Sequence, residues 1–445
     1  MRALAGDYFS PTLKTVLVHK RSWRDPGPVV NVGVHNAYGY AVAGYETHLV
    51  VGMGPPSETD DDLRSYYGLD PHPNLQIHRI ARKSLFGSNS TLPIFWHAYR
   101  LIRRLAEGSP VAAIAREPSF LPYLALLSRS PQIRTCFEAH NFYADLSWRT
   151  DRIRIQDRHQ SWLERMCIPR LAGLAGIVAP LTDLYGERFP GVPCATFPLG
   201  AQPLQPGDIE ARRLARRAVY VGHLHTAKGV KTLIEAVSPA NGDLRASFWG
   251  GTDEQVAKYG ARIKAKGLGD RLEFSAFRPP DELQRALATE ASVGVVALHD
   301  SFYNANLTCP AKALDYLSHG LPVVASDLPS IRSLLGPAAI YVPPADGVAL
   351  RAALLGLLGD PVAYREQSAL SWSRAEELAW PKRACRVIDW LSDSQKTPQE
   401  SESILPKTKR SASWKKWGIK MLHLFWCASH WLLSENGDWW GVELV

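Results

Sequence analysis

The residues from Thr308 to Asp327, TCPAKALDYLSHGLPVVASD, constrain the fold of this chain more than any other stretch. Pro310 opens a short helix-like segment that carries Lys312 and Asp315, and an apolar strand follows after a glycine. A helix, a glycine and a buried strand in this order are typical of an open parallel α/β sheet. The free N–H groups and the dipole of a helix N-terminus favour phosphate, and Asp315 lies further along, within reach of ribose hydroxyls. The stretch therefore predicts a nucleotide site.

The pattern Pro-x-Lys-x-x-Asp-Tyr-x-x-x-Gly-x-Pro-Val-Val-Ala-Ser in this stretch resembles the donor-binding helix of GT-B glycosyltransferases. The resemblance is to glycosyltransferase family four in particular, whose members are retaining enzymes. That family usually has two glutamates eight positions apart here. The second falls on Asp315, which is one methylene shorter, and the first falls on Leu307. Asn304, Asn306 and Thr308 are the nearby side chains that can take the place of the missing carboxylate.

Strand-like and helix-like segments alternate through residues 1–203, as expected of βαβ units with a parallel sheet. Strands are expected at Thr15–Val18, Glu46–Val51, Val111–Ala115, Arg134–Glu138 and Gly176–Ala179. Helices are expected at Val32–Gly44, Ile94–Leu105, Gln156–Leu174 and Thr182–Phe189. These residues predict an N-terminal Rossmann-like domain, which the resemblance makes the acceptor domain.

Residues 204–391 repeat the alternation after a polar, Pro/Gly-rich hinge. Strands are expected at Ala218–Val221, Ala246–Trp249, Leu272–Ser275, Val293–Val296, Pro322–Ala325 and Ala339–Val342, with helices including Lys231–Val237 and Asp253–Lys266. The fold class is therefore α/β, and the resemblance implies two Rossmann-like domains facing across a cleft. The second would bind the nucleotide-sugar donor, and its last helix, at about 380–391, would cross back to the first.

The loop from Gly222 to Gly229 follows a strand and precedes a helix. Gly222 allows close approach of the backbone to a ligand, and Lys228 can neutralise phosphate charge. The spacing resembles the family's strand-Gly-Arg and Lys-Gly element, which holds the donor diphosphate. His223 stands at the arginine position, where a neutral imidazole would lack the positive charge or would hydrogen-bond the phosphate. The alternative is a surface lysine in an ordinary loop.

Glu138-Ala-His140 stands at the end of an expected strand, where α/β sheets expose functional residues. It resembles the family's Glu-x-His element, whose histidine lies near the transferred sugar. His140 would then hydrogen-bond a sugar hydroxyl or steady the acceptor, whereas Glu138 would brace the loop. A structural histidine is the alternative. Phe277, before Asp281-Glu282-Leu283, matches the segment past the nucleobase, or is a plain core residue.

The resemblance implies transfer of a glycosyl group with departure of a nucleoside diphosphate. The residues expected to carry catalysis are His140, Lys228 and Asp315. The expected donor site comprises Gly222, His223, Lys228, Gly229, Phe277, Asn306, Thr308, Cys309, Lys312 and Asp315. Lys228 and the amides at Asn306–Cys309 would stabilise the leaving group, because preorganised donors act best on developing charge.

No metal site and no cofactor are expected, the nucleotide sugar being a substrate. Asp60-Asp61-Asp62 follows Thr59 and leads into Leu63–Tyr67, so helix capping explains these carboxylates better than metal binding. The expected acceptor is a glycan, a lipid-linked molecule or another small acceptor, and no nucleic acid. The alternatives are an enzyme like a sugar-nucleotide epimerase and a non-catalytic GT-B protein that binds nucleotide or glycan.

The chain has 445 residues and a formal net charge of +8, with arginine gathered in Tyr99–Arg104, Trp148–Arg158 and Arg212–Arg217. Such clusters attract phosphates or form solvated helix faces. Six widely spaced cysteines suit a reducing cytosol better than a disulfide framework. With no apolar run long enough for a span and no apolar leader segment, a cytoplasmic location is expected, with the inner face of the membrane as a peripheral site.

Residues 392–408 predict a polar linker, and residues 409–445 predict a basic, tryptophan-rich amphipathic tail. Trp414, Trp417, Met421 and Phe425 share one side of a helical wheel, and Lys415, Lys416 and Lys420 lie mostly opposite. Such a helix suits the membrane interface, so residues 409–433 are expected to meet a membrane surface. Docking on the chain itself or on a partner protein, and disorder, are the alternatives.

Overall fold

The computed structural model describes residues 13–25, 28–54, 62–85, 88–225, 228–238 and 243–393. The tail predicted at 409–445 and nearly all of the predicted linker lie outside the described residues, as do Asp60 and Asp61. The helix predicted after these aspartates is α2 (Asp62–Ser65). The five cysteines that the structure describes are free thiols.

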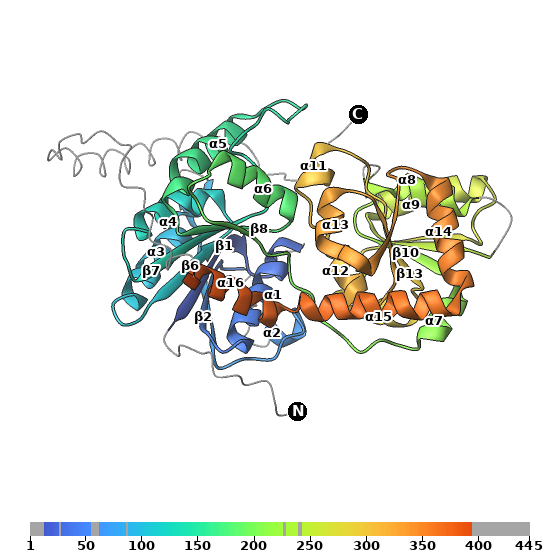
Figure 1. Ribbon diagram of the computed structural model, residues 1–445, viewed down its shortest axis with the longest axis horizontal. Helices are drawn as coiled ribbons and strands as arrows, with labels where there is room; N and C mark the ends of the chain where they lie inside the picture. The colour runs from blue at the N-terminus through green and yellow to red at the C-terminus, as the bar shows by residue number, and fades with distance from the viewer. Residues whose placement is uncertain are drawn as a thin grey trace.

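The described chain forms two lobes, each built on one parallel sheet (Figure 1). The first lobe has strands β1 (Lys14–Ser22), β2 (Glu46–Gly52), β3 (Leu75–Ile80), β6 (Val111–Ala115), β7 (Ile133–Ala139), β8 (Gly173–Gly176) and β9 (Cys194–Thr196). Their order in the sheet is β3-β2-β1-β6-β7-β8-β9, and all neighbours are parallel. A small antiparallel hairpin joins β4 (Lys83–Leu85) to β5 (Ser88–Ser90).

Helices cover both faces of the first sheet because its strands are apolar on both sides. Val16 and Val18 of β1 share one core with the buried sides of α3, α4 and α5, whereas Leu17 shares another with α1 and α16. This alternation is the period of two that a strand imposes. The helices are α1 (Pro28–Val42), α3 (Leu92–Leu105), α4 (Leu121–Leu127), α5 (Ile155–Cys167) and α6 (Ala179–Arg188).

The second lobe has strands β10 (Arg217–Val221), β11 (Arg245–Gly251), β12 (Leu272–Ala276), β13 (Val293–Val296), β14 (Val323–Ser326) and β15 (Ala339–Val342), in the order β12-β11-β10-β13-β14-β15. Its helices are α7 (Ile209–Ala215), α8 (Val230–Val237), α9 (Asp253–Ala265), α10 (Pro280–Thr289), α11 (Phe302–Asn306), α12 (Ala311–Ser318), α13 (Pro329–Leu335), α14 (Gly347–Gly359) and α15 (Pro361–Glu377). All neighbouring strands are parallel, so the predicted α/β class is confirmed.

The last described helix, α16 (Trp380–Asp393), returns to the first lobe after α15 has passed along the second (Figure 1). It packs against α1, and its buried residues Ala384, Val387, Ile388 and Leu391 belong to a core of the first lobe. A side chain at Gly200 would collide with the Trp380 ring, so the absence of a Cβ allows the helix to approach. The crossing helix predicted for this region therefore completes the first lobe.

Two predicted elements of the first lobe were wrong in their extent. The helix expected over Gln156–Leu174 ends at Cys167, because a 3-10 turn containing Pro169 follows and Leu174 belongs to β8. The strand expected over Gly176–Ala179 ends at its first residue, since Ala179 begins α6. Strands β3 and β9 were not predicted.

None of the described helices is by itself long and apolar enough to cross a membrane. Within the described part of the chain, α14 and α15 taken together meet that criterion, as a pair bent by 103°.

Candidate active site

The loop after β10 brings Gly222 and His223 next to Lys312 of α12. Gly222 has φ +120°, a conformation that favours glycine, and the place of its missing Cβ lies 3.9 Å from Lys312 Nζ. The Tyr220 hydroxyl donates to the His223 carbonyl oxygen at 2.6 Å and so fixes the start of this loop. The two sequence motifs, about ninety residues apart in the chain, therefore meet at one point of the second lobe.

Lys312 and Lys228 are two neighbouring lysines for which the described residues provide no counter-charge. Lys312 Nζ is buried, lies 3.5 Å from the Tyr220 ring centroid, and has no hydrogen-bond partner among the described residues. Burial and the nearby Lys228 hold the pKa of Lys312 well below its ordinary value. Burial also lowers the pKa of Lys228, whose Nζ lies 5.6 Å from the Tyr303 ring centroid. Neither lysine forms an ion pair with a residue that the structure describes.

Gly229 anchors the turn that carries Lys228. Its φ is +84°, and a side chain there would collide with the Ala297 carbonyl oxygen just after β13. Only glycine satisfies both conditions at once, so the loop backbone lies directly against the end of β13.

His223 and Phe277 meet edge to face at the same strand ends. Their ring centroids are 4.7 Å apart with planes at 69°, and Phe277 is 52% exposed. Burial, with His225 and Lys312 nearby, lowers the pKa of His223, so its imidazole is neutral at pH 7. The positive charge that the family has at this position is absent. Phe277 is not a core residue, which removes that alternative.

The segment before α12 presents backbone amides instead of a carboxylate. Leu307, at the position of the family's first glutamate, is buried in the core at 1% exposure. Asn306 Nδ2 donates to the Phe302 carbonyl oxygen, and Asn304 Nδ2 to that of His299. Among the described residues, no backbone hydrogen bond is donated by the amides of Thr308 and Cys309. Among the described residues these two amides have no backbone acceptor, and in the first turn of α12 the Ala313 amide donates to the Pro310 carbonyl oxygen while the two amides before it have no acceptor within the helix.

Asp315 lies one turn after Lys312 on α12. Its carboxyl group is hydrogen-bonded to Gln284 of α10, whose Oε1 is also 2.6 Å from His319 Nε2. Burial raises the pKa of Asp315 to about 7, against the effect of the Gln284 hydrogen bond. Asp315 therefore changes charge near neutral pH.

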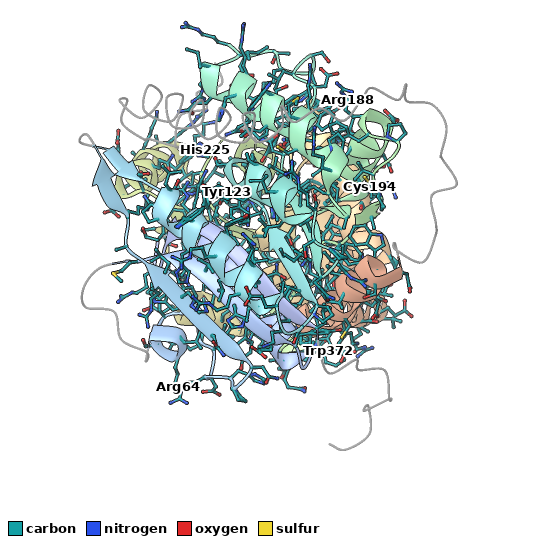
Figure 2. All side chains as sticks on the ribbon, turned by 90° about the vertical axis from the view of Figure 1, so that its left-hand side faces the viewer. Arg64, Tyr123, Arg188, Cys194, His225 and Trp372 are labelled. Atoms are coloured by element: carbon teal, nitrogen blue, oxygen red, sulfur yellow. The ribbon has the colours of Figure 1, made fainter. Side chains whose placement is uncertain are left out.

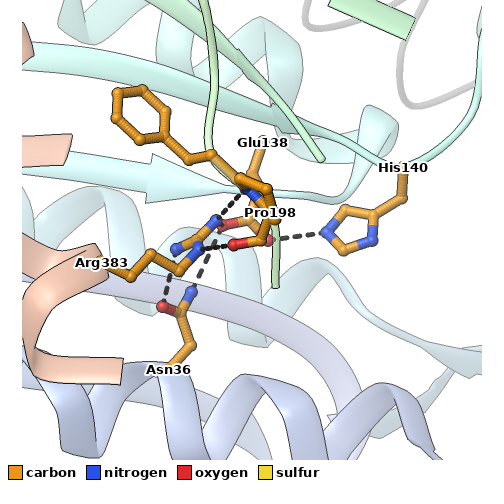
Figure 3. Close-up of polar contacts among 6 residues, drawn as sticks. Asn36, Glu138, His140, Pro198 and Arg383 are labelled. Atoms are coloured by element: carbon orange, nitrogen blue, oxygen red, sulfur yellow. Dashed lines mark hydrogen bonds and ion pairs between the residues drawn. The ribbon is translucent and has the colours of Figure 1, made fainter. Parts of the chain in front are cut away.

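His140 belongs to a buried polar network in the first lobe (Figure 3). His140 Nε2 lies 2.6 Å from Glu138 Oε1, and Arg383 of α16 donates to Glu138 Oε2 at 2.7 Å and to Asn36 Oδ1 at 2.9 Å. The Pro198 carbonyl oxygen accepts from Arg383 Nε at 2.8 Å. Asn36 Nδ2 also donates to Glu138 Oε2 at 3.3 Å, so His140, Arg383 and Asn36 together hold the carboxylate of Glu138 in place.

The charges in this network are set by burial and by the ion pair. Burial opposes ionisation of Glu138, but Arg383 and the hydrogen bond with His140 hold the pKa of Glu138 well below its ordinary value. Burial and Arg116 lower the pKa of His140 to about 4, so its ring is neutral at pH 7. A neutral imidazole can donate one hydrogen bond and accept another. Glu138 braces the loop and is not free to act as a base.

Side chains of the two lobes contact each other near the network that holds His140. Trp148, in the loop after β7, stacks on Phe302 of α11 with ring centroids 4.9 Å apart and planes at 16°. The backbone amide of Ala179 donates to Ser333 Oγ at 2.8 Å. The charges of Arg383 and Glu138 also reach the Cys309 thiol, whose pKa burial raises to about 12. The second lobe thus brings Cys309 close to the network that holds His140.

The structure brings Gly222 next to Lys312 and His223 into contact with Phe277, and it places His223 and Lys228 close enough to Lys312 for their charges to interact. Asp315 shares a helix with Lys312 but is tied to Gln284. Sequence reasoning missed Asn36, Arg383, Trp148 and Phe302. Arg383 is 245 residues from its partner Glu138, and no local signal links them. The aromatic pair follows no motif, although Trp148 begins one of the arginine-rich segments.

Residues 215–360 match the family model for Glycosyl transferases group 1. No curated protein matches the sequence. The chain is similar in structure to sucrose-phosphate synthase from Thermosynechococcus elongatus, with 18% identity and a TM-score of 0.61 over 86% of this chain and 99% of that one. It is also similar to a TarM variant from S. aureus in complex with Fondaparinux, alpha-GlcNAc-glycerol and UDP, with 10% identity and a TM-score of 0.64 over 85% and 99%.

A third similar structure is HepE of Anabaena in complex with UDP and glucose, with 15% identity and a TM-score of 0.57 over 85% of this chain and 99% of that one. At such low identities these likenesses establish the fold. The match of the second lobe adds the family. Residues 215–360 belong to the group 1 glycosyl transferases, and the chain is a glycosyltransferase with the two-lobed GT-B fold.

Proposed function

We propose that this glycosyltransferase takes a sugar from a nucleoside-diphosphate sugar, with the diphosphate leaving between Lys228, Lys312 and the amides of Thr308 and Cys309. The observation that carries the proposal is the pair of neighbouring lysines without a carboxylate partner in the described residues. Two such cations repel each other, and an anion between them removes this cost. The similar HepE structure has been solved with UDP-glucose, which supports a ligand of this class.

The leaving diphosphate gains negative charge as the glycosidic bond breaks. Fixed donors aimed at that charge stabilise the transition state without reorganisation. Lys312 and Lys228 provide cations, and the amino end of α12 provides free N–H groups and a favourable dipole. His223 is neutral and would contribute a hydrogen bond at most. In the family an arginine and a lysine hold the diphosphate. We infer that Lys228 and Lys312 together supply this positive charge here.

The nucleoside would lie along the strand ends of the second lobe. Phe277 offers an exposed ring next to His223, against which a base can pack. Asp315 would accept hydrogen bonds from ribose hydroxyls in its ionised form, and its position one turn from Lys312 suits adjacent ribose and phosphate groups.

His140 would meet the transferred sugar or the acceptor from the first lobe. Its ring is neutral, and Glu138 orients it through a 2.6 Å hydrogen bond. We further propose an acceptor that is a glycan, a lipid-linked molecule or another small hydroxyl compound, and retained anomeric stereochemistry, as the family resemblance implies. Because the lysines neutralise the diphosphate, transfer would not need a metal ion.

The first experiment incubates the purified chain with a panel of nucleotide sugars and measures release of nucleoside diphosphate, with and without membrane extract. A parallel series contains a chelator, and NMR of the product gives the anomeric configuration. Release with one donor, undiminished by the chelator, supports the proposal. Binding without turnover in every mixture would contradict it.

A pair of lysine variants tests the site itself. Lys228→Ala should lower affinity for the nucleoside diphosphate at least tenfold while the protein stays folded, since a charge-assisted contact is lost. Lys231→Ala is the matched control, because Lys231 is three residues away, is 71% exposed and pairs with Glu235. Equal affinities of the two variants would refute the site.

A further inference from the structure

The outer side of the first lobe carries exposed basic and aromatic side chains on α3 and α5, with α4 between these two helices. Figure 2 looks onto this side of the lobe, with Tyr123 of α4 labelled on it. Helix α4 contacts both α3 and α5, so the three lie side by side. We call it the outer face, and its exposed residues are Trp96, Arg100, Arg103, Arg104, Leu126, Ile155, Arg158, Trp162, Arg165 and Met166.

All exposed charges of these three helices are positive. Helices α3 and α4 contain no acidic residue, and the two acids of α5, Asp157 and Glu164, are buried. The arginines of residues 212–217 behave differently. Arg212 is buried and donates to the His319 carbonyl oxygen, whereas Arg213 and Arg217 pair with Glu210 and Glu273. Arg100, Arg103, Arg104 and Arg158 of the outer face form no ion pair with a described residue, whereas Arg165 donates to the Ala144 carbonyl oxygen and its charge reaches Asp145.

Large apolar side chains lie among these arginines. Trp96 is 52% exposed and stacks on Tyr99, with ring centroids 5.6 Å apart, and the Arg103 guanidinium lies 5.9 Å from the Tyr99 ring centroid. On α5, Ile155 and Trp162 are 67% and 44% exposed. Tryptophan, tyrosine and arginine together are typical of surfaces that lie in the membrane interface, where rings enter the headgroup region and guanidinium groups meet phosphates.

We propose that the outer face binds the surface of an anionic lipid bilayer. Its charge is complementary to acidic headgroups, and the exposed isoleucine, leucine and methionine side chains need an apolar partner, which a bilayer supplies and a nucleic acid does not. The chain's own tail is a poorer occupant, because residues 407–420 are themselves basic and like charges repel. The surface is separate from the donor site, so the proposal does not depend on the proposed function.

The test measures how the full chain co-sediments with vesicles of phosphatidylcholine alone or mixed with phosphatidylglycerol. Two variants alter the outer face, Arg100→Gln with Arg158→Gln, and Trp96→Ala with Trp162→Ala. Two matched controls alter the second lobe, Arg262→Gln with Lys264→Gln on α9, and Leu214→Ala with Val348→Ala, whose side chains are 62% and 82% exposed. The far-UV circular dichroism spectrum and the midpoint of thermal unfolding of each variant show that it is folded.

The chain is expected to bind the anionic vesicles and not the neutral ones. The double arginine variant should bind them roughly 25-fold more weakly, about fivefold per arginine, which corresponds to about 1 kcal/mol per basic residue near the membrane. The tryptophan variant should also bind more weakly, and the controls should match the original chain. Unchanged vesicle binding by both face variants would overturn the proposal, and this is the result expected if the tail alone binds the membrane. Binding to duplex nucleic acid in preference to vesicles would also overturn it.

Discussion

At the scale of single residues, Lys312 is the most informative side chain because it is costly to the fold. Its Nζ is buried without a hydrogen-bond partner among the described residues, and the charge of a second lysine, Lys228, lowers its pKa further. Buried polar groups without partners destabilise the native state. Lys312 lowers stability, yet it lies at the amino end of α12 and faces the loop that carries Gly222. A bound anionic ligand that provides the missing partner explains why such a residue is present.

Replacement of Lys312 by methionine should therefore separate stability from binding. Lys312→Met keeps the length of the side chain and removes the buried amine, so the free energy of unfolding should rise by about 1–3 kcal/mol. Affinity for the nucleoside diphosphate should fall at least tenfold. Urea unfolding and calorimetric titration measure the two quantities. A variant that is less stable than the original chain would show that Lys312 supports the fold instead.

Asp315 predicts a dependence of stability on pH. Its pKa is raised in the folded protein to about 7 from an ordinary value of 3.8, so the stability it contributes is fully present below about pH 4 and is lost as the pH rises through 7. Asp315→Asn, which cannot ionise, should be more stable than the original chain at pH 8 and similar at pH 4. The difference is at most a few kcal/mol, since one pKa unit corresponds to about 1.4 kcal/mol.

Thermal or urea unfolding of both proteins at pH 4, 6 and 8 checks this prediction. Parallel curves for the original chain and Asp315→Asn across this range would contradict the raised pKa of Asp315.

At the scale of elements, α16 is held to the first lobe by one buried ion pair as well as by apolar packing. Arg383 is fully buried and contacts Glu138, Asn36 and two backbone carbonyl groups. A buried pair adds little over an apolar replacement, but the loss of one partner leaves an uncompensated charge. The helix thus depends on both members of the pair being present.

Arg383→Met should destabilise the protein by about 3–5 kcal/mol, because it leaves Glu138 charged and buried. The double variant Arg383→Met with Glu138→Gln should recover most of that loss. Urea unfolding of the single and double variants forms a double-mutant cycle. If the losses from the two single variants simply add, the pair is not coupled.

Elements with a strong apolar signature could be predicted from the sequence, and those defined by context could not. The strands at Val111–Ala115 and Val293–Val296 are continuous apolar runs and were found within their observed bounds. In contrast, β8 consists of Gly-Leu-Ala-Gly, whose residues have little strand preference. The prediction assigned the first part of β8 to a helix and its last residue to the start of a strand. Its place in the sheet is fixed by pairing with β7 and β9.

The candidate site divides in the same way. Gly222, Lys228 and Lys312 lie in short local patterns, and such patterns can be recognised in a single sequence. Arg383 and Phe302 act through contacts with residues far away in the chain, namely Glu138 and Trp148. Tertiary packing alone defines these partners, so no local pattern reveals them.

At the scale of the whole molecule, the stack of Trp148 on Phe302 joins the lobes next to Lys228, because Tyr303 follows Phe302 and carries the Lys228 contact. Burial raises the pKa of Tyr303, and the charge of Arg149 from the first lobe opposes that rise. An aromatic pair of this kind contributes about 0.5–1.5 kcal/mol. It can therefore favour the joined arrangement without locking it.

Trp148→Ala should lower the rate of transfer by roughly three- to tenfold, the factor that corresponds to an aromatic pair. It should also increase the share of donor lost to water, because a looser arrangement of the lobes excludes water less well. Assays that follow hydrolysis and transfer in the same mixture measure both. Phe302→Ala should have the same effect, and the double variant should add nothing further; additive losses would contradict a shared role.

The return of α16 to the first lobe also orders events during synthesis. The ribosome completes β1 to β9 long before it reaches Arg383, which follows Glu138 by 245 residues. At ordinary elongation rates Arg383 follows Glu138 by roughly 12–50 s and the end of β9 by roughly 9–37 s. During that time the surface of α1 that later packs against α16 is exposed in the nascent lobe, and Glu138 lacks its partner Arg383. Completion of the first lobe therefore awaits the end of the second, and the first lobe expressed without α16 would leave α1 uncovered.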